Sequence, residues 1–262
     1  MLTDFRKDMY SQYVTRFTAS NLSSSPKIAT AYHRWCDVKF KPFLDRLSKH
    51  SRIVELGCGP GHMLTYLLGQ GFVNVMGIDI SDEQIDIARR AGLPAQTEDA
   101  FAFLENTSQM FDAIIAIDFL EHFTKLEARN LMLLAASRMH AGGVLITQTP
   151  NGACLMPGQV IYGDLTHCTI YTDQSLRQLM LHSGFDNCRF YEAGPVPNSF
   201  AGRIRVALWH LLRLVANLIR TIEAGKCQSV WTENMICIAR KAGCGNSLQS
   251  TGAQEAYQNG HL

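Results

Sequence analysis

The sequence of 262 residues lacks the features that define several protein classes. Its eight cysteines include no CxxC pair and no zinc-ligand spacing, so we interpret them as small apolar residues of a reducing compartment. No run of about 18 uncharged apolar residues is present, and no membrane-spanning helix is predicted. The net charge is only +1, which gives no global attraction to nucleic acid or to anionic membranes. These absences favour a cytoplasmic globular protein.

The chain also lacks a secretory signal and internal repeats. The opening residues, MLTDFRKDMYSQYVTRF, contain acids and no apolar core run. Composition divides the chain into three predicted parts. Residues 1–48 form a helical arm or lid, residues 49–241 form the main domain, and residues 242–262, rich in Gly, Gln, Asn and Ser, form a disordered tail.

Short apolar runs alternate with helical patterns through the main domain. Buried parallel strands are expected at 52–56, 73–78, 112–117 and 143–149, with helices at about 61–69, 82–91 and 125–139. This rhythm predicts an α/β fold with a doubly wound, mostly parallel sheet. A further helix at 172–185, strands at 188–194 and 230–241, and an amphipathic helical insert at 197–228 follow.

Residues 52–81 read as a strand, a glycine-rich turn, a helix and a second strand that ends in an acid. Gly57, Gly59 and Gly61 let the backbone approach a ligand where side chains would collide. The following helix directs its free N–H groups to the same place. Asp79 ends the second strand, where a doubly wound fold holds a ribose diol. Glu55 would repel a phosphate but suits a ligand that carries an ammonium group, so a dinucleotide is disfavoured.

The motif VELGCGPG resembles motif I of the class I S-adenosylmethionine (SAM) methyltransferases, and EDA (98–100) and IDFLEHF (117–123) follow in the order of that family. The resemblance covers about residues 50–190. It implies a Rossmann-like sheet of seven strands with the last antiparallel, and SAM as cofactor with S-adenosylhomocysteine as product. It also implies that the cofactor is held by Glu55, Gly57, Cys58, Gly59, Gly61, Asp79, Ile80, Asp99, Ala100, Asp118 and Phe119. Outside the resemblance, Arg16 of the arm is a candidate to bind the SAM carboxylate; the alternative is that it lies on a solvated helix face.

The long connection after the fifth strand carries the best candidates for catalysis. We expect His167 to act as a general base and Asp164 to orient it. In the alternative interpretation, Asp164 caps a turn and His167 packs or bonds the backbone. His122 is the competing base, although a role in positioning the cofactor is more typical of it. A metal site built from Asp164, His167 and His122 is poor in carboxylates, and we predict no metal.

The methyl acceptor is predicted from analogy within the family. The chain resembles bacterial O-methyltransferases that act on sugar hydroxyls in polysaccharide assembly, and Arg203 and Arg205 would favour an anionic glycan or small molecule. Methylation of a quinone or other aromatic precursor is the alternative, and a non-catalytic SAM-binding scaffold is a distant one. No basic stripe or NPPY-type motif supports nucleic acid as a partner. Oligomeric state is not predicted.

The insert admits two interpretations. It can roof the substrate site with its leucines packed on the sheet edge. Alternatively, its segment 200–224 makes peripheral contact with the inner membrane surface and brings a lipid-linked substrate to the site.

Overall fold

The structure is a computed structural model of the chain, and it describes Met9 and residues 26–243. Its strands are β1 (Arg52–Leu56), β2 (Asn74–Asp79), β3 (Ala95–Thr97), β4 (Phe111–Ile117), β5 (Met139–Pro150), β6 (Phe185–Glu192) and β7 (Asn234–Lys241). Its helices are α2 (Pro26–Lys39), α3 (Lys41–Leu44), α4 (His62–Gly69), α5 (Asp82–Arg90), α6 (Ala100–Asn106), the 3₁₀ turn η2 (Leu120–His122), α7 (Lys125–Ser137), α8 (Pro157–Tyr162), α9 (Asp173–His182) and α10 (Phe200–Ala224).

Within residues 26–243 the seven strands form one sheet in the order β3-β2-β1-β4-β5-β7-β6. Neighbouring strands from β3 to β5 are parallel, and β7 runs antiparallel to both β5 and β6. The predicted doubly wound sheet with an antiparallel last strand is therefore confirmed. The chain order reverses between β1 and β4, and ligands of such sheets bind outside the carboxyl ends of the strands at that point.

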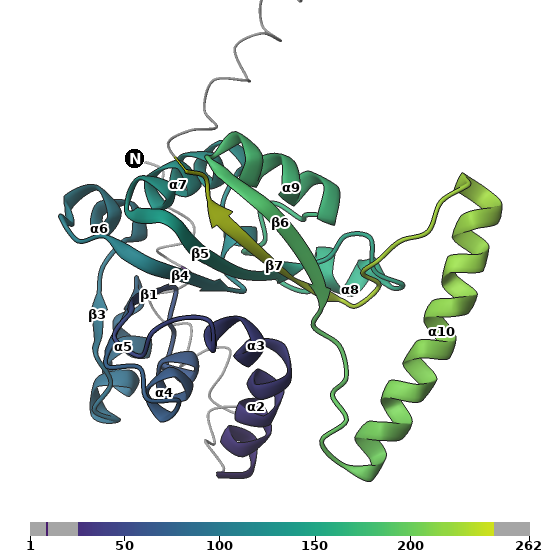
Figure 1. Cartoon of the computed structure of the whole chain (residues 1–262), viewed down its shortest axis with the longest axis horizontal. Helices are drawn as coiled ribbons and strands as arrows, with labels where there is room; N and C mark the ends of the chain where they lie inside the picture. The colour runs from purple at the N-terminus through teal and green to yellow at the C-terminus, as the bar shows by residue number, and fades with distance from the viewer. Residues whose placement is uncertain (1–8, 10–25, 244–262) are drawn as a thin grey trace, which may run out of the picture.

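Helices cover both faces of the sheet (Figure 1). On one face α6, α7 and α9 contribute residues such as Leu104, Leu131 and Leu176 to the core, and on the other face α2 to α5 contribute Phe40 and Leu64. Neighbouring positions of a strand point to opposite faces, so the central strands need apolar residues at nearly every position. This requirement explains the continuous apolar runs in the sequence.

The described part of the predicted arm packs into the core. Cys36 of α2, Phe40 between the two helices and Leu44 of α3 are at most 1% exposed and lie in the same cluster as the β1 residue Ile53. The helix breaks at Phe40, and Pro42 lies in the first turn of α3, where a proline is tolerated. Most of residues 1–25 and residues 244–262 lie outside the described residues, so the division into arm, domain and tail stays a prediction.

Four elements were not foreseen, one of which is the 3₁₀ turn η2, and three strands have clearly shifted bounds, one of which is β5, which begins at Met139 rather than 143. β3 has only three partly buried residues, Ala95–Thr97, and therefore no apolar run to reveal it. The helices α6 and α8 are each shorter than two turns. β6 begins at Phe185 rather than 188, and β7 begins at Asn234 rather than 230, because Val230 and Trp231 lie in a buried turn before it.

The helical insert is present between β6 and β7 as α10, but its leucines do not pack on the sheet edge. Leu211, Leu214 and Leu218 are more than half exposed, which contradicts the roof interpretation as we stated it. The polar side of the helix contacts the protein instead, because Trp209 and Arg213 bind Glu192 at the end of β6. Among the described residues, no helix is long and apolar enough to cross a membrane.

The glycine-rich turn between β1 and α4 uses backbone conformations that other residues avoid. Gly57, Gly59 and Gly61 have φ of 71°, 52° and 87°. A Cβ atom at Gly57 would overlap the ring of Phe119, and one at Gly61 would overlap the side chain of Leu93. The turn therefore requires glycine both for its conformation and for its close packing.

We predict that Gly61→Ala lowers the free energy of unfolding by clearly more than Gly71→Ala. Gly71 has nearly the same φ, 86°, but open space where its Cβ would lie. In the control, Gly71→Ala, the free energy of unfolding should fall only by the cost of placing alanine in a left-handed conformation, about 1–2 kcal/mol. In Gly61→Ala the overlap with Leu93 lowers it further. Urea denaturation measures both, and equal losses would contradict the packing role of Gly61.

Candidate functional site

A cavity of about 460 Å³ opens at the carboxyl ends of β1, β2 and β4, at the place where the strand order reverses. It is lined by Gly57, Gly59, Ile78, Asp79, Ile80, Ser81, Gln84, Glu98, Asp99, Ala100, Phe101, Asp118, Phe119, His122, Phe123 and Glu127. Eight of the predicted cofactor residues thus lie together in its wall: Gly57, Gly59, Asp79, Ile80, Asp99, Ala100, Asp118 and Phe119.

Asp79 joins the glycine-rich turn to the end of β2. Its Oδ2 accepts the Gly59 N–H at 2.9 Å, and its Oδ1 accepts the Ser81 N–H at 2.9 Å. Burial raises the pKa of Asp79 above its usual value, and the backbone donors act in the opposite direction. Each oxygen keeps acceptor capacity toward the cavity. Two adjacent hydroxyl donors, such as a ribose diol, fit this carboxylate.

Glu55, Cys58 and Gly61 lie behind the cavity rather than in its wall. Glu55 is 3% exposed, and within the described residues its Oε2 has no hydrogen-bond partner. Burial, and to a lesser degree the carboxylate of Asp79, raises the pKa of Glu55 well above its usual range. A buried carboxyl group without a donor is costly unless a ligand supplies one. An ammonium group nearby would stabilise it, which fits SAM better than a phosphate.

The second wall of the cavity begins at Asp99. Its Oδ1 caps α6 by accepting the N–H groups of Phe101 and Ala102 at 2.9 and 3.2 Å. Its Oδ2 is then the oxygen that an adenine amine would meet. Ala100 and the ring of Phe119 add apolar surface. A flat aromatic base between such surfaces is well accommodated.

Asp118 occupies an unusual backbone position just after β4. Its φ is 48°, in the left-handed region that Asp tolerates better than most residues. The side-chain amide of Gln148 in β5 donates to both carboxylate oxygens at 3.0 and 3.1 Å, and the Asp118 N–H donates to the Gln148 carbonyl at 3.0 Å. These bonds fix Asp118 at the cavity wall. Gln148 was not foreseen, since a single glutamine in an apolar strand gives no motif.

His122 also lines the cavity, and a chain of hydrogen bonds orients it. The Thr166 hydroxyl donates to Asp164 Oδ1 at 2.6 Å and accepts from His122 Nδ1 at 2.9 Å. The Thr166 carbonyl, which can only accept, lies 3.4 Å from the same nitrogen. The Asp118 carbonyl is a further hydrogen-bond partner of the ring, so Thr166 and Asp118 both hold it at the cavity wall. Burial alone would raise the pKa of Asp164, but the hydrogen bonds from Thr166 lower it and keep the carboxylate ionised.

This arrangement differs from the predicted pairing of Asp164 with His167. The carboxylate turns back onto the N–H and hydroxyl of Thr166 two residues later, which is a local turn typical of aspartate. The Nδ1 of His167 instead donates to the Val160 carbonyl at 3.1 Å. Asp164 thus orients His122, through Thr166.

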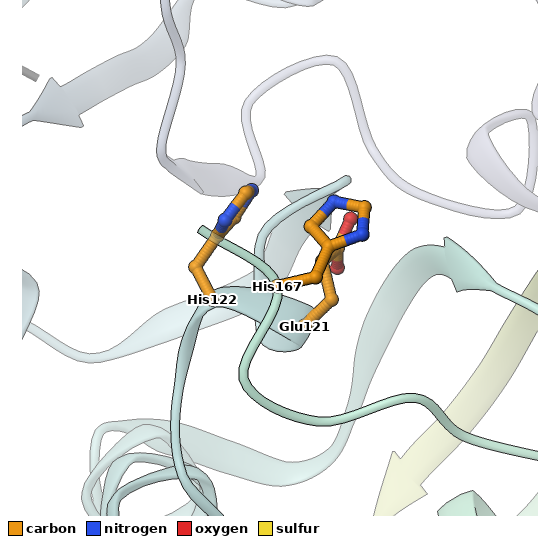
Figure 2. Close-up of side chains that lie close together, drawn as sticks. All are labelled: Glu121, His122 and His167. Carbon is orange, nitrogen blue, oxygen red and sulfur yellow. The ribbon is translucent and has the colours of Figure 1, made fainter. Parts of the chain in front are cut away.

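The imidazole rings of His122 and His167 lie side by side above Glu121 (Figure 2). Their centroids are 5.1 Å apart. The Glu121 carbonyl accepts the N–H groups of Cys168 and Thr169, so η2 is fastened to the loop that carries His167. The Glu121 carboxyl accepts the Thr149 hydroxyl at 3.0 Å. Two segments whose residues His122 and Thr166 are 44 positions apart in the chain thus form one cluster.

Glu121, His122 and His167 offer three ligand atoms within 4.8 Å of one another, so the cluster could hold a metal ion. The carboxylate in this cluster is Glu121 and not Asp164. Burial, and to a lesser degree Asp118, raises the pKa of Glu121 well above its usual range. The absence of a metal stays a prediction.

A second cavity, of about 880 Å³, lies between α10 and the carboxyl ends of β5 and β6. Its wall includes Trp35, Trp209 and Trp231, and also Arg205 and Glu233. Gln148 lines it as well, and the same side chain binds Asp118 in the first cavity. The two cavities are therefore neighbours across Gln148. Arg203 is exposed on α10 and does not line this cavity, and Arg16 lies outside the described residues.

We predict that Asp79→Asn weakens SAM binding about tenfold to a hundredfold, the range expected when a hydrogen bond to a charged group is lost. Isothermal titration calorimetry measures the affinity. Asp82→Asn, an exposed acid in the first turn of α5, is the control and should bind normally.

Burial raises the pKa of Asp79 above 3.8. Wild-type affinity should therefore fall as the pH is lowered toward that raised value, because protonation removes an acceptor. Unchanged affinity in Asp79→Asn would contradict the ribose assignment.

Comparisons with known proteins agree with this geometry. A family described as methyltransferase domain matches residues 29–189, which is more than half of the chain. No curated protein matches the sequence of this chain. The fold is similar to a SAM-dependent methyltransferase from Archaeoglobus fulgidus, with 17% identity, 80% of this chain and 94% of that chain covered, and a TM-score of 0.59.

Two other solved structures share the fold. One is magnesium protoporphyrin IX methyltransferase from Synechocystis with bound SAM, at 16% identity, 92% and 100% coverage and a TM-score of 0.57. The other is a SAM-dependent methyltransferase from Clostridium acetobutylicum, at 13% identity, 90% and 99% coverage and a TM-score of 0.57. The chain belongs to the methyltransferase domain family and is a SAM-dependent methyltransferase with the class I fold.

Proposed function

We propose that the protein is an O-methyltransferase that acts on a hydroxyl group of a sugar-containing acceptor, and that His122 is its general base. The observation that carries this proposal is the chain Asp164–Thr166–His122, which ends at the wall of the cofactor cavity. SAM supplies a methyl group on a sulfonium whose leaving group is a neutral thioether. The protein must therefore mainly align the acceptor and accept its proton.

The environment of His122 suits a base. Burial, and to a lesser degree the neighbouring His167, lowers the pKa of His122 below 6.5, so the ring is neutral near pH 7. Thr166 holds its Nδ1, and the Asp118 carbonyl is a further hydrogen-bond partner of the ring. In this proposal the ring takes up the proton of the acceptor hydroxyl, and the ionised Asp164 would stabilise the imidazolium that forms, through the hydroxyl of Thr166. His167, the base favoured by the sequence, lies beside it, with the ring centroids 5.1 Å apart.

The second cavity is the proposed acceptor site. Tryptophan rings stack on the apolar faces of sugars, and Trp35, Trp209 and Trp231 line this cavity. Arg205 would pair with an acidic group of the acceptor, while Glu233 on the same wall would bind hydroxyls. A sugar with an anionic substituent matches both groups.

The second candidate is an aromatic or quinone precursor. The same three tryptophans favour it, because aromatic rings stack on one another. Arg205 and Glu233 count against it, since a purely aromatic acceptor would leave both without a partner.

We predict that His122→Ala lowers kcat by about 10²–10⁴-fold, the usual contribution of a general base, and that His167→Ala lowers it less. His182→Ala, an exposed histidine at the end of α9, is the control. Because the pKa of His122 is lowered, kcat/KM should decline only below pH 6.5. Thr166→Val should shift the pH at which kcat/KM declines, because it removes the hydroxyl that connects His122 to Asp164. If His122→Ala stays active and His167→Ala does not, the base is His167.

We predict that methyl transfer from radiolabelled SAM goes to acidic sugars or glycolipids rather than to phenols or hydroquinones. Arg205→Gln should raise KM for an acidic acceptor with little change in kcat, since Arg205 lines the second cavity, whereas the proposed base lines the cofactor cavity. Arg129→Gln on the exposed surface of α7 is the control. Transfer to phenolic acceptors alone would select the second candidate.

A further inference from the structure

The helix α10 is mounted with its polar side toward the protein. Trp209 Nε1 donates to Glu192 at 2.8 Å, and Arg213 forms an ion pair with the same carboxylate at 3.2 Å. One turn further, the Asn217 side-chain oxygen accepts the Gln228 N–H at 2.8 Å and the Trp231 indole N–H at 3.3 Å. These bonds set the rotation of the helix about its axis. The opposite, apolar side must then face away from the sheet.

That opposite side is a long apolar surface, which we name the outer face of α10. Its members are large apolar side chains at helical spacing that are between 45% and 78% exposed: Phe200, Ile204, Leu208, Leu211, Leu212, Leu214, Val215, Leu218, Ile219 and Ile222. Four of them, Leu208, Leu212, Val215 and Ile219, form its border toward the protein and line cavities beside α10. In Figure 1 the helix stands apart from the sheet at the edge of the molecule. Contiguous exposed apolar surface of this size marks an interaction site in most proteins.

The charges of α10 identify the occupant of this face. Arg203 and Arg205 are exposed and flank its first turns on opposite sides, and α10 has no acid before Glu223. Arg220 pairs with that Glu223, and Lys226 is exposed just beyond the helix. The outer face is thus bordered by unbalanced positive charge. A second copy of the same face would bring like charges together, whereas an anionic lipid surface complements them.

The outer face is continuous with the second cavity. Leu208 and Leu212 belong to the outer face and also line that cavity. On the opposite wall, the exposed residues Leu155 and Met156 line the cavity too. An apolar path therefore leads from the outer face into the cavity beside the cofactor site. A wholly water-soluble acceptor would have no use for such a path.

We propose that α10 docks on the surface of an anionic lipid bilayer with its outer face buried, and that the methyl acceptor is an amphiphile that enters the second cavity from the bilayer. The part that concerns the acceptor rests on the proposed function; the docking does not. The helix would lie in the interface, with its arginines at the level of the headgroups and Trp209 on the side of the protein. The bilayer would then cover the mouth of the cavity.

Flotation with vesicles tests the docking without any methyl transfer. The full chain should float with vesicles of phosphatidylglycerol and phosphatidylcholine, and much less with phosphatidylcholine alone. Leu211→Gln with Leu218→Gln should weaken binding at least about tenfold, because both side chains lie in the outer face. The matched control is Leu126→Gln with Leu181→Gln, which changes two leucines of similar exposure on α7 and α9 and should bind normally.

A second pair of substitutions tests the contribution of the arginine charges to vesicle binding. Arg203→Gln with Arg205→Gln should weaken binding to phosphatidylglycerol vesicles about fivefold for each arginine and leave binding to phosphatidylcholine unchanged. SAM affinity, measured by calorimetry, should be normal in every variant, which shows that each one folds. Failure of the wild-type chain to float, or equal flotation of the leucine variant, overturns the docking.

A second copy is the competing occupant, and sedimentation tests it. If the wild-type chain forms a dimer that the Leu211→Gln, Leu218→Gln variant loses, and neither protein floats, the outer face is a dimer interface and the proposal is overturned. For the acceptor, the same leucine variant should lose at least about tenfold in kcat/KM toward a vesicle-embedded glycolipid and keep its rate toward a short-chain analogue. Equal losses on both overturn the amphiphile assignment, and no transfer to any hydroxyl overturns the proposed function instead.

Discussion

The site depends on one constraint, which is the glycine-rich loop 57–61 held at the ends of the parallel strands β1 and β2. The N–H groups of Gly57 and Cys58 both donate to the Ile78 carbonyl, and the Gly59 N–H donates to Asp79. The loop is therefore part of the sheet's hydrogen bonding, although it lies beyond the last residue of β1. Its positive φ angles leave the cavity floor open at the point where the strand order reverses. Everything that binds the cofactor is placed relative to this floor.

The candidate catalytic cluster also depends on loops that hydrogen bonds hold at the ends of parallel strands, here β4 and β5. Asp118 follows β4 directly and is held by Gln148 of β5, and the chain then turns through η2 so that Glu121 faces inward and His122 faces the cavity. The loop after β5 returns to this point because two of its N–H groups bind the Glu121 carbonyl. Two histidines thus meet without any sequence motif that contains both. The burial of His122 also sets its chemistry, since it lowers the pKa of that imidazole and favours the neutral form.

The helix α10 shows that amphipathicity does not by itself tell which side of a helix faces the protein. Its polar side is anchored by Glu192, whose carboxylate accepts from Trp209 and the Trp231 N–H and pairs with Arg213. A partly buried carboxylate that accepts two hydrogen bonds and forms an ion pair is a strong orienting contact. Because the polar side faces the protein, the leucines face outward beside a large cavity. An exposed apolar helix next to the proposed acceptor site would otherwise promote aggregation, and the proposed lipid surface would cover it.

The sequence by itself determined the fold class, the glycine-rich turn and the acids at the strand ends. These depend on local rules, namely the periodicity of apolar residues, the conformational freedom of glycine and the position of a residue at the end of a strand. Only the tertiary structure decided that Asp164 reaches His122 through Thr166, that Gln148 holds Asp118, and that the leucines of α10 face outward. Each of these contacts joins segments far apart in the chain or selects one of two sides of a helix. No local pattern encodes such a choice, because it depends on which partner the folded chain brings within hydrogen-bonding distance.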